Sequence, residues 1–129
     1  MPSNHEIIRD HYAASDRGDI DGMLAPLAPD ARWTEMAGFP YAGTYIGPEE
    51  VRRGVFERIG AEWDGYTAAI DELIDGGDTV IGIGTYSGTH RATGRFFEAR
   101  VAHVWRLAGG RVVAFEQFTD TALVRAALT

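Results

Sequence analysis

The sequence predicts an α+β fold in which helices and a curved antiparallel sheet enclose a small, mostly apolar pocket with a few ionisable groups. Three observations predict it. Apolar residues recur at helical spacing in the first part of the chain, whereas strand-like alternation and Gly-rich turns fill the second half. A length of 129 residues, 45% hydrophobic and 24% charged, suits one hydrophobic core, so we expect residues 1–129 to form a single domain.

Two helices are predicted before any strand. Ser3-x-x-Glu6 matches a capping box, and an apolar stripe at i, i+4 spacing follows until Gly18 provides a C-cap. The stripe consists of Ile7, Ile8, His11 and Tyr12. Asp19 can cap a second, short helix, which Pro26 stops early.

A strand and a third helix come next. Residues 31–36 alternate, which places Trp33 and Glu35 on the same face, and a loop rich in Gly and Pro is predicted over residues 38–47. Pro48 suits the first turn of a helix. Its apolar stripe consists of Val51, Val55, Phe56, Ile59 and Trp63.

The rest of the chain is typical of an antiparallel meander. Four strands are predicted near residues 66–74, 79–87, 96–107 and 111–119, with Gly-containing turns after the first and third. Gly82 and Gly84 lie two apart within a strand, a pattern that marks a bend or the close approach of another group. A short terminal helix follows, capped by Asp120 or Thr119.

Composition argues against several classes of function. The net charge is −7 and the 12 basic residues are scattered, which disfavours nucleic-acid and acidic-membrane partners. The absence of cysteine removes disulfides and thiolate chemistry. The histidines, His5, His11, His90 and His103, show no spacing that pairs two metal ligands, so neither a metal nor a cofactor is predicted. With no signal-like N-terminus and no membrane-length apolar stretch, we expect a cytoplasmic protein.

The order of the predicted elements resembles the cone-shaped α+β barrel of ketosteroid isomerases, nuclear transport factor 2, limonene epoxide hydrolases and SnoaL-like polyketide cyclases. Local matches are Gly-Asp-Ile-Asp-Gly at 18–22, Leu-Ala-Pro-Asp-Ala-Arg-Trp at 27–33, Tyr-Ile-Gly-Pro at 45–48, His-Val-Trp-Arg-Leu at 103–107 and Phe-Thr-Asp-Thr at 118–121. The resemblance spans nearly the whole chain and implies one enclosed pocket. Because this fold carries many activities, and also binding domains, it does not by itself specify a reaction.

Matching the chain to ketosteroid isomerases places Glu35 at the position of the catalytic base. The same matching puts His103 where a strand residue donates to the oxyanion, and His11, with Tyr12 beside it, where those enzymes carry an oxyanion-hole tyrosine. Both donors depart from that pattern, so steroid isomerisation itself is not implied. The epoxide-hydrolase reaction is excluded, because Ala102 stands where that family's Arg-x-Asp pair requires an acid after Arg100.

Each candidate catalytic residue also has a structural interpretation. Glu35 is either a base in an apolar cavity or a carboxylate that pairs with Arg32 or Arg100, or points to solvent. His103 either donates a proton to the ligand, or shuttles one, or is a core histidine bonded to a backbone carbonyl, an interpretation that suits His11 better still. Asp120 is either a second acid at the pocket mouth, as in SnoaL-like relatives, or a helix cap.

The predicted function is acid–base catalysis without a cofactor. Isomerisation, cyclisation or dehydration of a small apolar carbonyl compound of polyketide, terpenoid or steroid type fits these residues, with Glu35 as base and His103 as acid or oxyanion donor. The alternative is a ligand-binding or dimeric accessory domain in which no bond changes. We also expect a homodimer. The predicted pocket lining is His11, Tyr12, Trp33, Tyr45, Phe56, Trp63, Trp105, Phe115 and Gln117.

Overall fold

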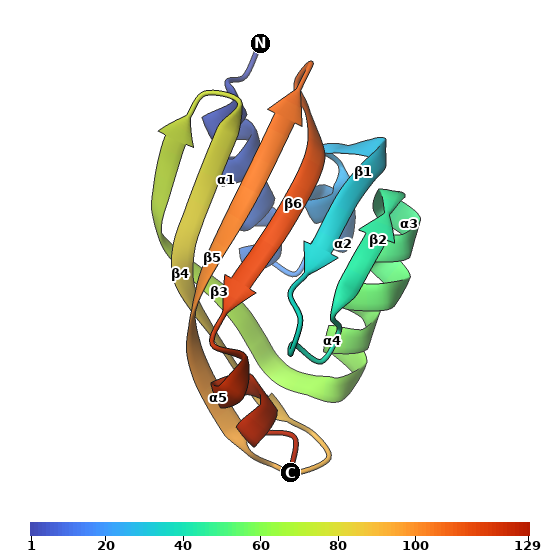
Figure 1. The fold of residues 1–129 in the computed structure, drawn as a ribbon, viewed down its shortest axis with the longest axis vertical. Coiled ribbons are helices and arrows are strands. Elements are labelled where there is room, and N and C mark those ends of the chain that lie inside the picture. Colours follow the sequence, from blue (N-terminus) through green and yellow to red (C-terminus); the bar gives the residue numbers. More distant parts are fainter.

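The computed structural model describes residues 1–129 and confirms the predicted α+β cone (Figure 1). Its helical elements are α1 (Asn4–Asp16), α2 (Ile20–Leu24), α3 (Gly47–Val51), the π-helical segment η1 (Arg52–Phe56), α4 (Glu57–Glu62) and α5 (Thr121–Ala126). Its strands are β1 (Leu27–Glu35), β2 (Gly43–Ile46), β3 (Trp63–Gly76), β4 (Thr79–His90), β5 (Phe96–Ala108) and β6 (Arg111–Thr119).

All six strands belong to one sheet in the order β2-β1-β6-β5-β4-β3. The meander β3–β6 is antiparallel throughout, as predicted, whereas β1 and β6 run parallel because the chain crosses from one side of the sheet to the other. In Figure 1, α1 and α2 lie behind the sheet. These two helices therefore cover one face, and the inward residues of the strands point towards them.

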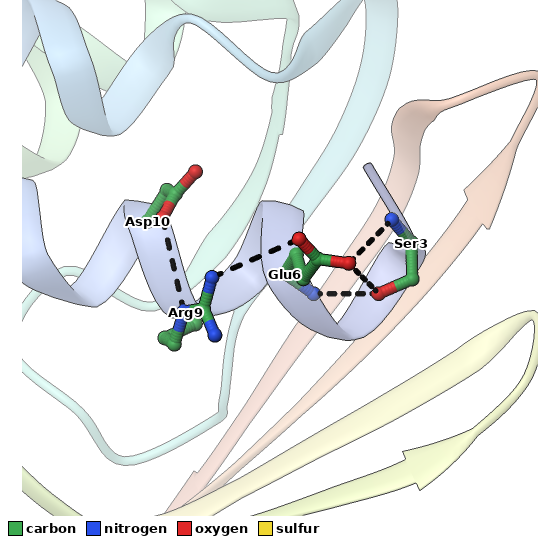
Figure 2. A network of polar contacts seen from close by, with 4 residues as sticks. All are labelled: Ser3, Glu6, Arg9 and Asp10. Atoms are coloured by element: carbon green, nitrogen blue, oxygen red, sulfur yellow. Dashed lines mark hydrogen bonds and ion pairs between the residues drawn. The ribbon is translucent and has the colours of Figure 1, made fainter. Parts of the chain in front are cut away.

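The N-terminus of α1 has the predicted capping box. The Glu6 backbone N–H donates to Ser3 Oγ over 3.1 Å, and the Glu6 carboxylate accepts from the Ser3 backbone N–H over 3.3 Å (Figure 2). Two N–H groups that lack partners within the helix are thereby satisfied. Capping starts the helix in a register that buries Ile8, His11 and Tyr12.

The predicted third helix forms as a continuous helical run, α3, η1 and α4, with a π-helical turn in its middle. It begins at Gly47, with Pro48 in the first turn, and ends at Glu62. The prediction that Trp63 belongs to this helix is wrong: Trp63 has an extended backbone and begins β3. Its side chain is nevertheless buried.

Two further boundaries differ from the predictions. The predicted loop contains β2, a short edge strand that pairs antiparallel with β1, so that Trp33 lies opposite Tyr45. β1 begins at Leu27, four residues earlier than expected. The residues of β2 and the first residues of β1 are extended because they pair with neighbouring strands of the sheet. Such pairing leaves little signal in the local sequence.

Gly82 is the site of a close approach, as its position in the strand predicted. A Cβ at Gly82 would lie 2.4 Å from the Tyr12 hydroxyl oxygen of α1. A Cβ at Gly84 would lie 2.2 Å from the Ala69 carbonyl oxygen, beside an irregularity in the pairing of β3 with β4. The missing side chains thus allow α1 and β3 to pack closely on β4.

The core consists of two buried clusters. One contains Ile8, Leu24, Trp33, Val80, Trp105, Val112 and Phe115 among its members. The other contains Phe39, Tyr41, Trp63, Tyr86, Phe97 and Val124 among its members. The partly buried Ile59 and Ile70 pack against both clusters. No helix is long and apolar enough to cross a lipid bilayer.

Candidate functional site

A cavity of about 360 Å³ lies between the inner face of the sheet and the helices. Its wall is drawn from α1, α2, η1, α4 and from β1, β3, β4, β5 and β6, and 12 of its 20 lining residues are hydrophobic. The exposed Gly18, Gly60 and Gly65 lie where the cavity meets the surface. The volume is within the range that binds small organic molecules.

Most of the predicted pocket residues meet in this one cavity. Glu35 and His103 both line it, together with His11, Tyr12, Trp33, Phe56, Trp63, Phe115 and Gln117. Glu35 lies on β1 and His103 on β5, and β6 separates the two strands. At the usual strand spacing their backbones are roughly 10 Å apart, which leaves room for a ligand between the side chains.

Glu35 is buried without any partner of opposite charge. Its residue is 4% exposed, and Oε2 has no hydrogen-bond partner. Arg100 binds Asp71 instead, and Arg32 lies exposed on the opposite face of β1. The ion-pair and solvent-facing interpretations of Glu35 are therefore excluded.

Burial raises the pKa of Glu35 to about 8, because the charged carboxylate loses its hydration. The nearby Trp33 indole N–H opposes this rise but stops short of a hydrogen bond, and Trp33 Nε1 is itself buried without a partner. Roughly one molecule in ten has an ionised Glu35 at pH 7, given that pKa. Such a carboxyl group can exchange a proton with a ligand near neutral pH.

His103 is held between two tyrosines. Its Nδ1 lies 2.7 Å from the Tyr12 hydroxyl and its Nε2 lies 2.5 Å from the Tyr86 hydroxyl. Burial, and next the neighbouring His11, lower the pKa of His103 to about 3, so the ring is neutral. Both ring nitrogens are thus engaged by tyrosine hydroxyls, and neither is free to bond another group directly.

Two further hydrogen bonds extend this network. The Trp105 indole N–H donates to the Tyr12 hydroxyl over 2.8 Å, and the Gln117 amide N–H donates to the Tyr86 hydroxyl over 3.1 Å. Trp105 thus stands behind the cavity wall rather than in it, and is fully buried. Gln117 forms part of the wall, as predicted for its strand face.

His11 is satisfied by the backbone. Its Nδ1 lies 2.9 Å from the Met23 carbonyl oxygen, and its ring packs edge-on against Trp105 at 4.5 Å. Burial lowers its pKa to about 4, so it too is neutral. These contacts match the packing role that the sequence allowed for His11, although the ring also borders the cavity.

Besides Trp105, the structure leaves two other predicted site residues, Asp120 and Tyr45, outside the cavity wall. Asp120 caps α5, where its carboxylate accepts from the Leu123 backbone N–H, and it is exposed. The helix-cap interpretation accounts for Asp120, and a catalytic role has no support. Tyr45 is half-buried and its hydroxyl donates to the Tyr41 carbonyl outside the cavity.

Sequence reasoning missed Tyr66 and Tyr86, which both line the cavity. Their rings lie 5.4 Å apart on the neighbouring strands β3 and β4. Tyr86 continues the alternation of Gly82 and Gly84 on the inward face of β4, and this period-2 pattern is the signal that could have identified it. Tyr66 is only partly buried and lies at an irregular part of β3, where no such pattern holds.

No cluster of three or more His, Cys, Asp or Glu side chains in this structure is arranged to hold a metal ion. The wall instead combines stacked aromatic rings, such as Trp33 on Phe115 at 3.8 Å, with one buried carboxyl group and several hydroxyls. The fold and this cavity together define a class of protein, namely α+β cones that enclose a largely apolar cavity.

Within that class the chain belongs to the SnoaL-like domain family, whose model matches residues 8–115. An NTF2-like protein from Burkholderia thailandensis E264 is 60% identical over 100% of this chain and 99% of its own, with a TM-score of 0.98. An NTF2-like protein of unknown function from Burkholderia pseudomallei K96243 is 35% identical over 100% and 99% of the two chains, with a TM-score of 0.90.

A third solved structure contains a bound molecule. TerC, co-crystallised with polyporic acid, is 27% identical over 95% of each chain, with a TM-score of 0.83. No curated protein matches the chain. The family and the fold are thus shown by several structures.

Proposed function

We propose that this protein is an acid–base enzyme that needs no cofactor and isomerises, cyclises or dehydrates a small, largely apolar carbonyl compound of polyketide, terpenoid or steroid type. The observation that carries the proposal is Glu35, a carboxyl group without a partner in an aromatic cavity. The ligand in the TerC structure supports a small organic molecule as the occupant.

In this proposal the ionised Glu35 removes a proton from the carbon next to the ligand carbonyl. The C–H electron pair moves into the ligand and charge develops on its oxygen as an enolate. A tyrosine hydroxyl held by His103 stabilises that oxygen by a hydrogen bond. Return of the proton from Glu35 to another carbon completes an isomerisation.

Glu35→Gln tests the assignment of the base. A suitable probe is 2-tetralone, a small apolar ketone with an acidic C–H, and its deuterium exchange in D₂O is followed by NMR. We expect catalysed exchange by the wild type and a loss of about 10²–10⁴-fold in the variant, since a positioned base contributes that much. Binding, measured by quenching of Trp fluorescence, stays within a few-fold.

The outcomes separate the two candidate functions. A variant with full exchange activity would show that Glu35 is not the base. Binding of 2-tetralone by both proteins without catalysed exchange by either would favour the binding-domain alternative, in which the same cavity holds a molecule unchanged.

We also propose that two copies associate through the outer face of the sheet. On that face Ile81 lies opposite Val104, Ile83 opposite Ala102, and Ala102 opposite Phe118. These side chains are partly or fully exposed. A contiguous apolar patch of this kind favours burial against another protein surface.

A further inference from the structure

The side chains of Tyr12, His103 and Tyr86 form a hydrogen-bonded chain. Together they carry one more N–H or O–H hydrogen than the hydrogen bonds between them use. His103 is neutral and carries one N–H, and each phenol carries one O–H. Two links, Tyr12 to Nδ1 and Tyr86 to Nε2, consume two of these three hydrogens. One phenol hydrogen is therefore left to donate elsewhere.

The groups that flank the chain cannot accept that hydrogen. The Trp105 indole is a donor only, and it already donates to Tyr12. Gln117 Oε1 accepts from the Met36 backbone N–H, which fixes the orientation of the amide and leaves its N–H₂ group facing Tyr86. Both flanking bonds thus bring their own hydrogen, and the spare hydrogen has no protein acceptor among these contacts.

The surroundings decide which phenol holds the spare hydrogen. The Tyr12 hydroxyl is enclosed by Trp105, by His103 and by the backbone at Gly82, where a Cβ would lie only 2.4 Å away. Tyr86 has its ring beside Tyr66, on the side of the cavity that faces β3. The Tyr86 hydroxyl has hydrogen-bond contacts to His103 and Gln117, and its pKa is raised by burial and further by the charge of Glu35, which it faces. Tyr86 is therefore the phenol that donates the spare hydrogen into the cavity, which requires His103 to be protonated on Nε2.

A second hydroxyl is available at the same place. Tyr66 Oη is buried and has no hydrogen-bond partner. Burial raises the pKa of Tyr66 well above its usual value, and the charge of Glu35 raises it further, as expected for groups that share one end of a cavity. Two phenol donors and one carboxyl group thus converge on the space that a ligand would fill.

We propose that the hydroxyls of Tyr66 and Tyr86 together bind the carbonyl or enolate oxygen of the ligand, and that His103, as its Nε2–H tautomer, is the positioning residue that aims the Tyr86 hydrogen into the cavity. This rests on the acid–base function proposed above and deepens it, because it names the oxyanion donors. The ligand class is a compound whose oxygen gains negative charge, with a planar apolar body that packs against the aromatic wall formed by Trp33 and Phe115.

The first test uses 4-nitrophenol, whose anion mimics an enolate and absorbs visible light, at about pH 6, where the free phenol is mostly neutral. We expect the wild type to bind it as the anion. Tyr86→Phe and Tyr66→Phe should each weaken binding about ten- to a hundredfold, the value of a hydrogen bond to a charged acceptor. Tyr45→Phe is the matched control, because that hydroxyl lies outside the cavity, and it should stay within twofold.

The second test is the ¹⁵N NMR spectrum of His103, which distinguishes a protonated ring nitrogen from a bare one. We expect hydrogen on Nε2 in the wild type, and a change of the His103 signals in Tyr86→Phe but not in Tyr45→Phe. Hydrogen on Nδ1, no binding of 4-nitrophenol at millimolar concentration, or equal affinity in all variants would overturn the proposal. If Glu35→Gln abolishes exchange while Tyr86→Phe and Tyr66→Phe bind 4-nitrophenol normally, Glu35 is still the base, but the two tyrosines are not the oxyanion donors.

Discussion

At the scale of single residues, the ionisable groups in the cavity are kept neutral by burial. Glu35, His11 and His103 are all 4–5% exposed, and none has a partner of opposite charge. The same desolvation raises the pKa of the carboxyl group and lowers the pKa of both imidazoles. An apolar wall with neutral polar groups suits a ligand that is itself largely apolar.

These pKa shifts predict a maximum of stability near pH 6.5. The folded protein keeps the Glu35 proton up to about pH 8, whereas an unfolded carboxyl loses it near 4.5, so this contribution falls as pH rises through that window. The unfolded histidines gain protons below 6.5, whereas the folded ones resist until about 4 and 3, so stability also falls towards acid. Each group changes the free energy of unfolding by at most about 1.4 kcal/mol per pH unit.

Urea unfolding of the wild type and Glu35→Gln between pH 6.5 and 8.5 checks the Glu35 contribution. We expect the wild type to lose stability relative to the variant as the pH rises, because glutamine does not ionise. Parallel stability curves for the two proteins would contradict the raised pKa of Glu35.

The raised pKa also predicts the pH dependence of the reaction. If the ionised Glu35 is the base, kcat/KM for exchange rises about tenfold per pH unit below 8 and levels off above it. Initial rates between about pH 6 and 9.5 measure this profile. A rate that falls through pH 8 would instead identify the protonated carboxyl group as the active form.

At the scale of elements, α1 packs closely on β4 at Gly82, where it meets Tyr12 of the cavity wall. We expect Gly82→Ala to destabilise the protein by about 1–3 kcal/mol, since the new methyl group overlaps the Tyr12 hydroxyl. Gly60→Ala is the matched control. Gly60 lies inside α4, where an added methyl group would have no atom within 4 Å, so alanine there should stabilise by about 0.5–1 kcal/mol.

Thermal or urea unfolding measures both glycine variants. Equal effects of the two substitutions would show that helix and strand propensity, rather than the contact with Tyr12, determines the cost at Gly82. An unperturbed His103 NMR signal in Gly82→Ala would likewise contradict the close approach, because Tyr12 is bonded to that ring.

At the scale of the whole molecule, the apolar outer face of the sheet predicts the oligomeric state. We expect a dimer by light scattering, and Ala102→Lys should shift it towards monomer, because Ala102 lies between Ile83 and Phe118 and a lysine there must lose its hydration on association. Ala13→Lys on the exposed side of α1 is the control and should leave the dimer intact. A wild-type monomer at micromolar concentration would refute the proposed association.

Much of the fold was predictable because it follows from local patterns. The capping box, the Gly-Gly turns and the alternation of β5 and β6 each act over a few residues, and all three appear where expected. β2 and the start of β1 were not predictable, because pairing between separate segments makes them extended. Trp63 lies in β3 rather than in the predicted helix for the same reason, because strand pairing is not visible in the local sequence.

By itself the sequence determined which side chains share a face, since the periods of helix and strand are local: Trp33 with Glu35, and His103 with Trp105. Only the tertiary structure decided what those side chains do. His103 meets Tyr12 from 91 residues away and Tyr86 from 17, while Asp120 remains a cap. Hydrogen-bond partners and desolvation depend on contacts between distant segments, and these arise only when the sheet closes around the cavity.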